Sequence, residues 1–278
     1  MTVSSQNCEP SQIEVQVFGP VRVVGAARPL HRAYTLDLVT HLVLHRDGVS
    51  TDQWVTALWP DRLMAPATIH STSSAARRSL GVDASGSDHL PHGHRRLKVA
   101  SSVQCDLDRL ERTLTSDLEE RLHGVQQLRG RPFEGLRRFD WIVAEGHMTK
   151  ACEVASALTL SVVKELLLLE GSATVVPILR KGLSVNPYDE ALWRALLDAT
   201  FALGNAAGLD LVMVELGAVL GAMVGAPNHV VIDEVADMVH PMTWDRYQTL
   251  RSFRRPRLLP HVKPSAKGDS LPHVKPSA

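Results

Sequence analysis

Residues 65–81, APATIHSTSSAARRSLG, have the boundaries of a single helix. Pro66 suits the first turn because its missing N–H would have no partner there, and Gly81 suits the left-handed conformation that often ends a helix. Three apolar residues recur at helical spacing and should face the interior: Ile69, Ala76 and Leu80. The opposite face is polar and includes the adjacent Arg77 and Arg78, so this helix is the first candidate for a recognition surface.

The residues before this helix predict two strands and two further helices. Apolar and polar side chains alternate over residues 13–18 and 21–24, with a Gly-Pro turn between them, which indicates strand, turn and strand. Apolar residues at helical spacing over 34–45 indicate a first helix. Ser50 is a good N-cap for a second helix, which ends before Pro60.

The residues after it, HLPHGHRRLKV at 89–99, predict a β-hairpin with its turn at Gly93 and an alternating strand through Leu97. Two strands, three helices and a terminal hairpin are the element order of a winged helix-turn-helix. We therefore predict an α+β winged helix-turn-helix over residues 13–105, preceded by a polar leader over residues 1–12.

From Asp106 onward, leucine-rich helical periodicity replaces the strand signals, which predicts a domain boundary near residue 105 and an all-α domain over residues 106–250. Gly171 and Gly204 lie 33 residues apart, and similar apolar residues and a proline follow each. These residues are Val176, Leu179, Leu183 and Pro187 in the first segment, and Leu209, Met213, Leu216 and Pro227 in the second. The spacing is close to the period of about 34 residues of tetratricopeptide (TPR) hairpins. We predict a TPR-like helical repeat; the alternative is a bundle without repeats.

Residues 251–278 have a different character. RSFRRPR carries four arginines, and the octapeptide LPHVKPSA occurs twice, at 259–266 and 271–278. This basic, proline-rich tail has little to bury and is expected to be disordered. The duplication is either a docking motif in two copies or a slipped or engineered end. The basic tail residues are Arg251, Arg254, Arg255 and Arg257.

Charge is unevenly divided along a chain whose formal net charge is zero. Residues 1–104 hold 10 Lys and Arg against 8 Asp and Glu, residues 105–250 hold 13 against 21, and residues 251–278 hold 7 against 1. Blocks of this kind usually mark interaction surfaces. No apolar run approaches the roughly 20 residues of a membrane span, and the N-terminus lacks a signal-peptide pattern, so we expect a cytoplasmic protein with no membrane partner.

No residue pattern indicates an enzyme or a cofactor. The chain has no Gly-rich phosphate loop, no GxSxG or HExxH motif and no nucleophile with a recognisable base. Its three cysteines are widely spaced and are expected to be reduced thiols. His89, His92 and His94 crowd the predicted hairpin, but no structural zinc spacing is present, so we expect exposed loop histidines and no metal site.

Several motifs together resemble one family. In the first domain they are VFGPVRVVG at 17–25, DGVSTDQWVTALWPD at 47–61, TIHSTSSAARRSLG at 68–81 and GHRRL at 93–97; in the second they are LRGRPFEG at 128–135 and NPYDEALWRALLDATFALGN at 186–205. The first set resembles the OmpR-like DNA-binding domain of SARP-type (AfsR-like) bacterial transcriptional regulators, and the second resembles their bacterial transcriptional activation domain (BTAD). The combination looks closest to the BTAD modules of LysM-containing membrane proteins.

The resemblance implies that the third helix enters the major groove of DNA and that the wing touches the backbone. The implied DNA-binding residues are Thr68, His70, Ser71, Ser74, Arg77 and Arg78 on the helix, with Arg95, Arg96 and Lys98 on the wing. Arg77 or Arg78 would hold a guanine or, more commonly, a phosphate. The helix departs from the family pattern at Ser73, Ala75 and Ala76, which should weaken both its packing and its base discrimination.

The resemblance therefore implies a DNA-binding transcriptional regulator, an activator by analogy, with double-stranded DNA as one partner. RNA polymerase or another regulator would bind the acidic helical domain, where the protein's own basic tail could also dock, and a homo-oligomer is possible. The alternative is a non-enzymatic scaffold or adaptor in which a degenerate winged helix contacts protein and reads no operator.

Overall fold

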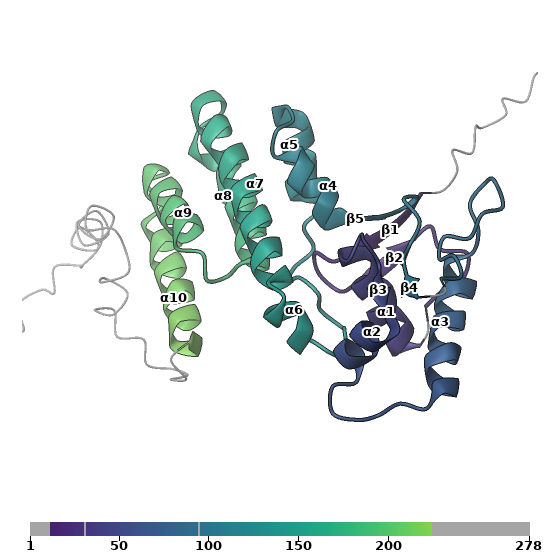
Figure 1. Cartoon of the computed structure of the whole chain (residues 1–278). Helices are drawn as coiled ribbons and strands as arrows, with labels where there is room; N and C mark the ends of the chain where they lie inside the picture. Colours follow the sequence, from purple (N-terminus) through teal and green to yellow (C-terminus); the bar gives the residue numbers. More distant parts are fainter. Residues whose placement is uncertain (1–11, 31, 94, 224–278) are drawn as a thin grey trace, which may run out of the picture.

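A computed structural model describes residues 12–30, 32–93 and 95–223 (Figure 1). Most of the predicted leader, the last part of the predicted helical domain and the whole basic tail, with its four arginines, lie outside the described residues.

The N-terminal part is built on a small sheet of three strands in the order β2-β1-β5. The strands are β1 (Ile13–Gln16), β2 (Arg22–Val24) and β5 (Val103–Cys105). β1 pairs with β2 antiparallel and with β5 parallel. Every second residue of β1 is buried, as the apolar-polar alternation predicts, so one face of the sheet supplies the core of this part.

Three helices follow in the N-terminal part: α1 (Ala33–Leu44), α2 (Thr51–Leu58) and α3 (Pro66–Leu80). α1 packs on β1 and β5, and α2 and α3 pack against α1. α2 begins with a capping box, in which the Ser50 hydroxyl accepts from the Gln53 N–H and the Gln53 side chain accepts from the Ser50 N–H. α3 ends at Gly81, whose φ of 77° is unfavourable for residues with a Cβ. α3 packs against α1, and the predicted three-helix order is confirmed.

The predicted hairpin centred on Gly93 is wrong in its pairing. β4 (Arg96–Leu97) pairs with the distant β3 (Val49–Ser50), and the chain then continues into β5 beside β1. The Arg96 guanidinium fixes this arrangement by donating from Nε and Nη2 to the Gly48 carbonyl, at 3.2 and 2.6 Å. The tight turn lies earlier in the chain, where the Asp83 carboxylate accepts from the backbone N–H groups of Ser85 and Ser87.

The rest of the described chain is helical, and its long helices stack side by side (Figure 1). The helices are α4 (Asp106–Thr113), α5 (Leu118–Gln126), α6 (Asp140–Ala144), α7 (His147–Leu169), α8 (Ser172–Val185), α9 (Glu190–Ala202) and α10 (Ala206–Met223). Gly171 joins α7 to α8 with φ 85°, and Gly204 joins α9 to α10 with φ 64°. The structure confirms the prediction that these glycines lie at the turns between paired helices. It also confirms the predicted order of an α+β winged helix followed by an all-α repeat. None of the described helices has the length and apolar character that crossing a membrane requires.

The two parts share one continuous core. The Phe133 N–H donates to the Val17 carbonyl at 2.8 Å, so a loop of the helical part pairs with the chain directly after β1. The buried carboxylate of Asp106 accepts from the N–H groups of Val17, at 2.8 Å, and Phe18, at 3.3 Å. Burial raises the pKa of Asp106 to about 6 despite these two donors. The division at residue 105 remains a prediction, because the two parts pack as one body.

Candidate nucleic-acid interface

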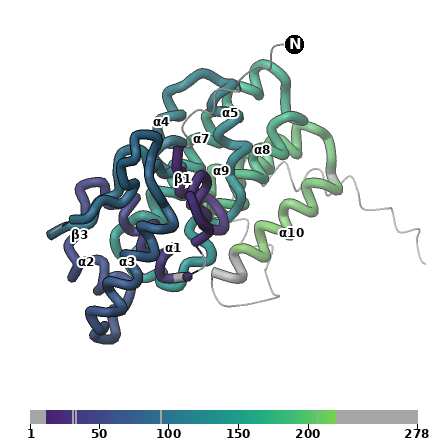
Figure 2. Tube along the Cα trace, turned by 90° about the vertical axis from the view of Figure 1, so that its right-hand side faces the viewer, coloured from purple at the N-terminus to yellow at the C-terminus, as the bar shows by residue number. Residues whose placement is uncertain are grey.

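α3 presents one polar face to solvent at the outer edge of the molecule. Thr72, Ala76 and Leu80 are buried against the N-terminal core. His70, Ser71 and Arg78 are exposed, and Thr68 and Ser74 are half-buried beside them. Figures 1 and 2 both place α3 on the side of the molecule opposite α10, so no other described helix covers this face. A helix in this position is open to a partner as large as a DNA duplex.

The small residues of α3 are accommodated within the helix packing. Ala76, where the family pattern has leucine, is completely buried. The Thr72 hydroxyl donates to the Thr68 carbonyl, and the Ser73 hydroxyl donates to the His70 carbonyl, so both hydroxyls bond to the helix's own backbone. Their polar groups therefore need no partner outside the helix. The predicted weakening of base discrimination is not tested by this geometry.

Arg77 and Arg78 occupy different environments. Arg77 is half-buried, and its Nε donates to the Leu90 carbonyl at 2.8 Å, which ties α3 to the loop that follows it. Arg78 is exposed and makes no hydrogen bond or ion pair to the described residues. Of this predicted pair, the structure leaves Arg78 available to a ligand, while Arg77 already has a structural partner.

Two arginines that sequence reasoning missed lie beside Arg78. Arg28 and Arg32 precede α1 and, with Arg78, line an open pocket of about 360 Å³ between the start of α1 and the end of α3. The Arg28 N–H donates to the Ser79 carbonyl at 3.0 Å, and Arg32 Nη1 lies 3.4 Å from the Ser71 hydroxyl. The other lining residues are Pro29, Thr35, Ala75 and Ser79, so no carboxylate lines the pocket.

The arginines of this surface have no acidic partner among the described residues. Arg28, Arg32 and Arg78 form no ion pair there. Elsewhere in the described residues, six arginines pair with a carboxylate: Arg46, Arg109, Arg121, Arg138, Arg180 and Arg194. Three neighbouring cations without a protein counterion make a surface suited to an anion with several charges, such as a nucleic-acid backbone.

The predicted wing residues differ in their exposure and in their hydrogen-bond partners. Arg95 and Lys98 are exposed, whereas the Arg96 guanidinium is held by the Gly48 carbonyl described above. The expectation that the loop histidines are exposed is wrong for His89, which is buried with Nδ1 2.8 Å from the Ser102 hydroxyl. It is correct for His92, and His94 lies outside the described residues.

The comparisons with known proteins agree with this architecture. The chain is 27% identical over 207 residues to the transcriptional regulatory protein MoaR1 of Mycobacterium tuberculosis, and equally so to MoaR1 of Mycobacterium bovis BCG. These matches cover 66% of this chain and 65% of those proteins, so the chain matches slightly less than two thirds of their length. No model of a known protein family matches the chain.

The solved structures include one clear fold match. Mycobacterium tuberculosis EmbR, solved in complex with a low affinity phosphopeptide, aligns with a TM-score of 0.58 over 88% of this chain and 70% of EmbR, at 18% identity. This match confirms the predicted fold of a winged helix followed by a helical domain. The similarity to MoaR1 supports the resemblance to bacterial transcriptional regulators.

Proposed function

We propose that this chain is a DNA-binding transcriptional regulator that places the exposed face of α3 in the major groove. The observation that carries the proposal is the group of unpaired arginines, Arg28, Arg32 and Arg78, beside that exposed polar face. The similarity to transcriptional regulatory proteins supports the transcriptional role in this proposal.

The chemistry of this face favours backbone contacts over base readout. The three guanidiniums suit phosphate oxygens, which attract cations regardless of sequence. Ser71 and Ser74 have short side chains, and neither they nor His70 can make the bidentate contact of arginine with guanine. We therefore propose that much of the affinity comes from phosphates and that Arg78 is the helix residue placed to contact a guanine or a phosphate.

The test is duplex binding by the full-length chain over a series of salt concentrations. Each phosphate contact that is lost should make the slope of log K against log salt shallower by about 1. We expect Arg28→Ala, Arg32→Ala and Arg78→Ala each to weaken binding and reduce the slope. Arg180→Ala and Arg194→Ala are matched controls, because these arginines sit on the helical part and pair with Glu215 and Glu190.

Unchanged affinity and slope in the three variants would overturn the proposal. If the chain then still binds a protein partner through α3, the scaffold alternative is correct. The same measurement therefore separates a regulator that touches DNA from an adaptor that retains only the winged-helix shape.

We also propose that a protein partner, RNA polymerase or another regulator, binds the acidic helical part. The excess of acidic residues over residues 105–250 supports this assignment, and a pocket of about 810 Å³ there is lined by Asp117, Glu119 and Glu120 among others. Purified RNA polymerase should bind the full chain, and Glu119→Lys with Glu120→Lys should weaken that binding. Glu153→Lys, on exposed α7 surface, is the control. Equal binding by all of these variants would rule out this surface.

A further inference from the structure

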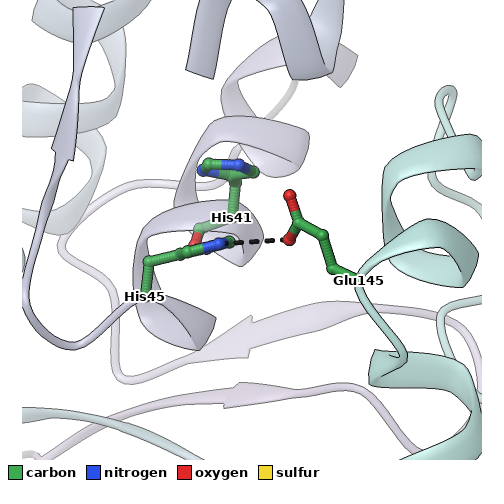
Figure 3. A group of neighbouring side chains, drawn as sticks. All are labelled: His41, His45 and Glu145. Carbon is green, nitrogen blue, oxygen red and sulfur yellow. Dashed lines mark hydrogen bonds and ion pairs between the residues drawn. The ribbon is translucent and has the colours of Figure 1, made fainter. Parts of the chain in front are cut away.

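Three histidines and a glutamate meet where the winged helix joins the helical part. His41 lies in the last turn of α1 and His45 follows that helix, so the two rings stack one turn apart with centroids separated by 4.2 Å. Glu145 lies in the turn after α6, and His147 is the first residue of α7. Figure 3 shows His41 and His45 on one ribbon and Glu145 facing them from the other.

The donor atoms of this cluster converge. His45 Nε2 and His147 Nε2 lie 3.1 and 3.2 Å from the same oxygen, Oε2 of Glu145. One ligand atom each from His41, His45 and Glu145 can be chosen so that all lie within 4.8 Å of one another. Ligand atoms around a tetrahedral zinc ion lie about 3.3 Å apart, as bond lengths near 2.0 Å require. The atoms therefore lie up to about 1.5 Å farther apart than in a tetrahedral zinc site, so the side chains would have to close around an ion.

The surroundings also suit a metal ion. His45 Nδ1 lies 2.8 Å from the His41 carbonyl oxygen, so it donates there and turns the Nε2 lone pair toward Glu145. Metal-bound histidines usually have such a second hydrogen bond. A lone pair facing a carboxylate oxygen at this distance requires a cation between them, either a proton or a metal ion.

The environment of His41 is a second, independent observation that favours a metal site. Its side chain is almost completely buried, and its Nδ1 has no hydrogen-bond partner. Trp141 packs edge-on against it with the ring centroids 4.7 Å apart, which shields one side of the cluster from water.

We propose that His41, His45 and Glu145, with His147 beside them, bind a divalent transition-metal ion of the zinc class. Imidazole nitrogens with one carboxylate oxygen are a donor set that such ions accept. His41 lies in α1 and His45 directly after it, whereas Glu145 precedes α7 and His147 begins it, so the ion would bridge the winged helix and the helical part. Binding would stabilise the folded chain and hold α1 against α6. This inference does not depend on DNA binding.

The test is titration of the chelator-treated full-length chain with Co²⁺, read by the visible absorption of tetrahedral cobalt, and with Zn²⁺, read by the thermal unfolding midpoint. We expect one equivalent of Co²⁺ to give the tetrahedral spectrum and Zn²⁺ to raise the midpoint. His45→Gln and Glu145→Gln should weaken binding by about 100-fold or more, since losing even an outer-shell partner costs 10–100-fold. His92→Gln and His123→Gln, at exposed histidines outside the cluster, are matched controls and should bind as the wild type does.

Circular dichroism without metal shows whether each variant folds. If His45→Gln does not fold, Glu145→Gln carries the same test at a side chain with 39% exposure. The proposal is overturned if the wild type gives no tetrahedral spectrum, since the cluster is then a hydrogen-bonded ion pair that holds a proton. It is equally overturned if the cluster variants bind metal as tightly as the wild type, since the ion then sits on other histidines.

Discussion

Arg77 Nε donates a 2.8 Å hydrogen bond to the carbonyl oxygen of Leu90, and this bond ties the end of α3 to the loop that follows it. Its neighbour Arg78 points to solvent with no partner among the described residues. Two adjacent arginines of one helix therefore have separate roles, the first in stability and the second in ligand contact.

Arg77→Ala should lower the free energy of unfolding by about 1–3 kcal/mol, because a charged donor is lost and the Leu90 carbonyl loses its partner. Arg78→Ala should leave stability unchanged within about 0.5 kcal/mol, as expected for an exposed side chain without contacts. Urea denaturation of both variants measures the difference. Equal effects on stability would contradict the division of roles.

Ala76→Leu should destabilise the protein, although leucine is the residue of the family pattern. Ala76 is completely buried in the packing of α3 against the N-terminal core. Extra methyl groups in a closed site typically cost about 1–3 kcal/mol. Denaturant unfolding checks this, and a gain in stability would mean that a cavity remains beside Ala76.

Asp106 should make stability depend on pH in a defined window. Its pKa is raised from 3.8 to about 6 in the folded chain, so the folded state holds the proton more tightly than the unfolded state. The carboxyl therefore stabilises the fold fully below about pH 4, and this contribution is lost as the pH rises through 6. Asp106→Asn cannot titrate. The free energy of unfolding of the wild type should fall relative to this variant by about 3 kcal/mol across the window. Unfolding curves of the two proteins that stay parallel from pH 4 to 7 would refute the assignment.

Gly182→Ala should loosen the packing of α8 against α7. A Cβ built at Gly182 would lie 2.7 Å from the Thr159 hydroxyl oxygen and 2.8 Å from its methyl carbon. The clash should outweigh the gain of about 1 kcal/mol in helix propensity and lower stability overall. Ser184→Ala, exposed on the same helix, is the control and should be neutral or slightly stabilising. A thermal midpoint for Gly182→Ala above that of the wild type would show that the helices separate without cost.

Local signals were enough to predict most of the helices. Pro66 and Gly81 mark the ends of α3 because their backbone preferences act within one turn, wherever the helix is placed. Gly171 and Gly204 mark the helical hairpins for the same reason. The polar face of α3 also follows directly from helical spacing.

The contacts between distant segments could not be predicted in the same way. Arg28 lies about 50 residues before Arg78, and only the packing of α1 on α3 brings them to one pocket. The strand at Leu97 pairs with Val49 instead of a neighbouring strand, so alternation predicted a strand but the wrong partner. His41 and His45 show the i, i+4 spacing of a shared helix face, which is a usable signal, but Glu145 joins them only in the folded chain.

Site-specific crosslinking tests most directly whether DNA lies against the exposed face of α3. A photoreactive residue at Ser71 on α3, or at Ser184 on α8, is irradiated in the full-length chain bound to duplex DNA; both positions are exposed. Crosslinking from position 71 with none from position 184 is the result that this structure predicts. Crosslinking from position 184 alone, or equal yields from both positions, would place the DNA elsewhere and contradict the account.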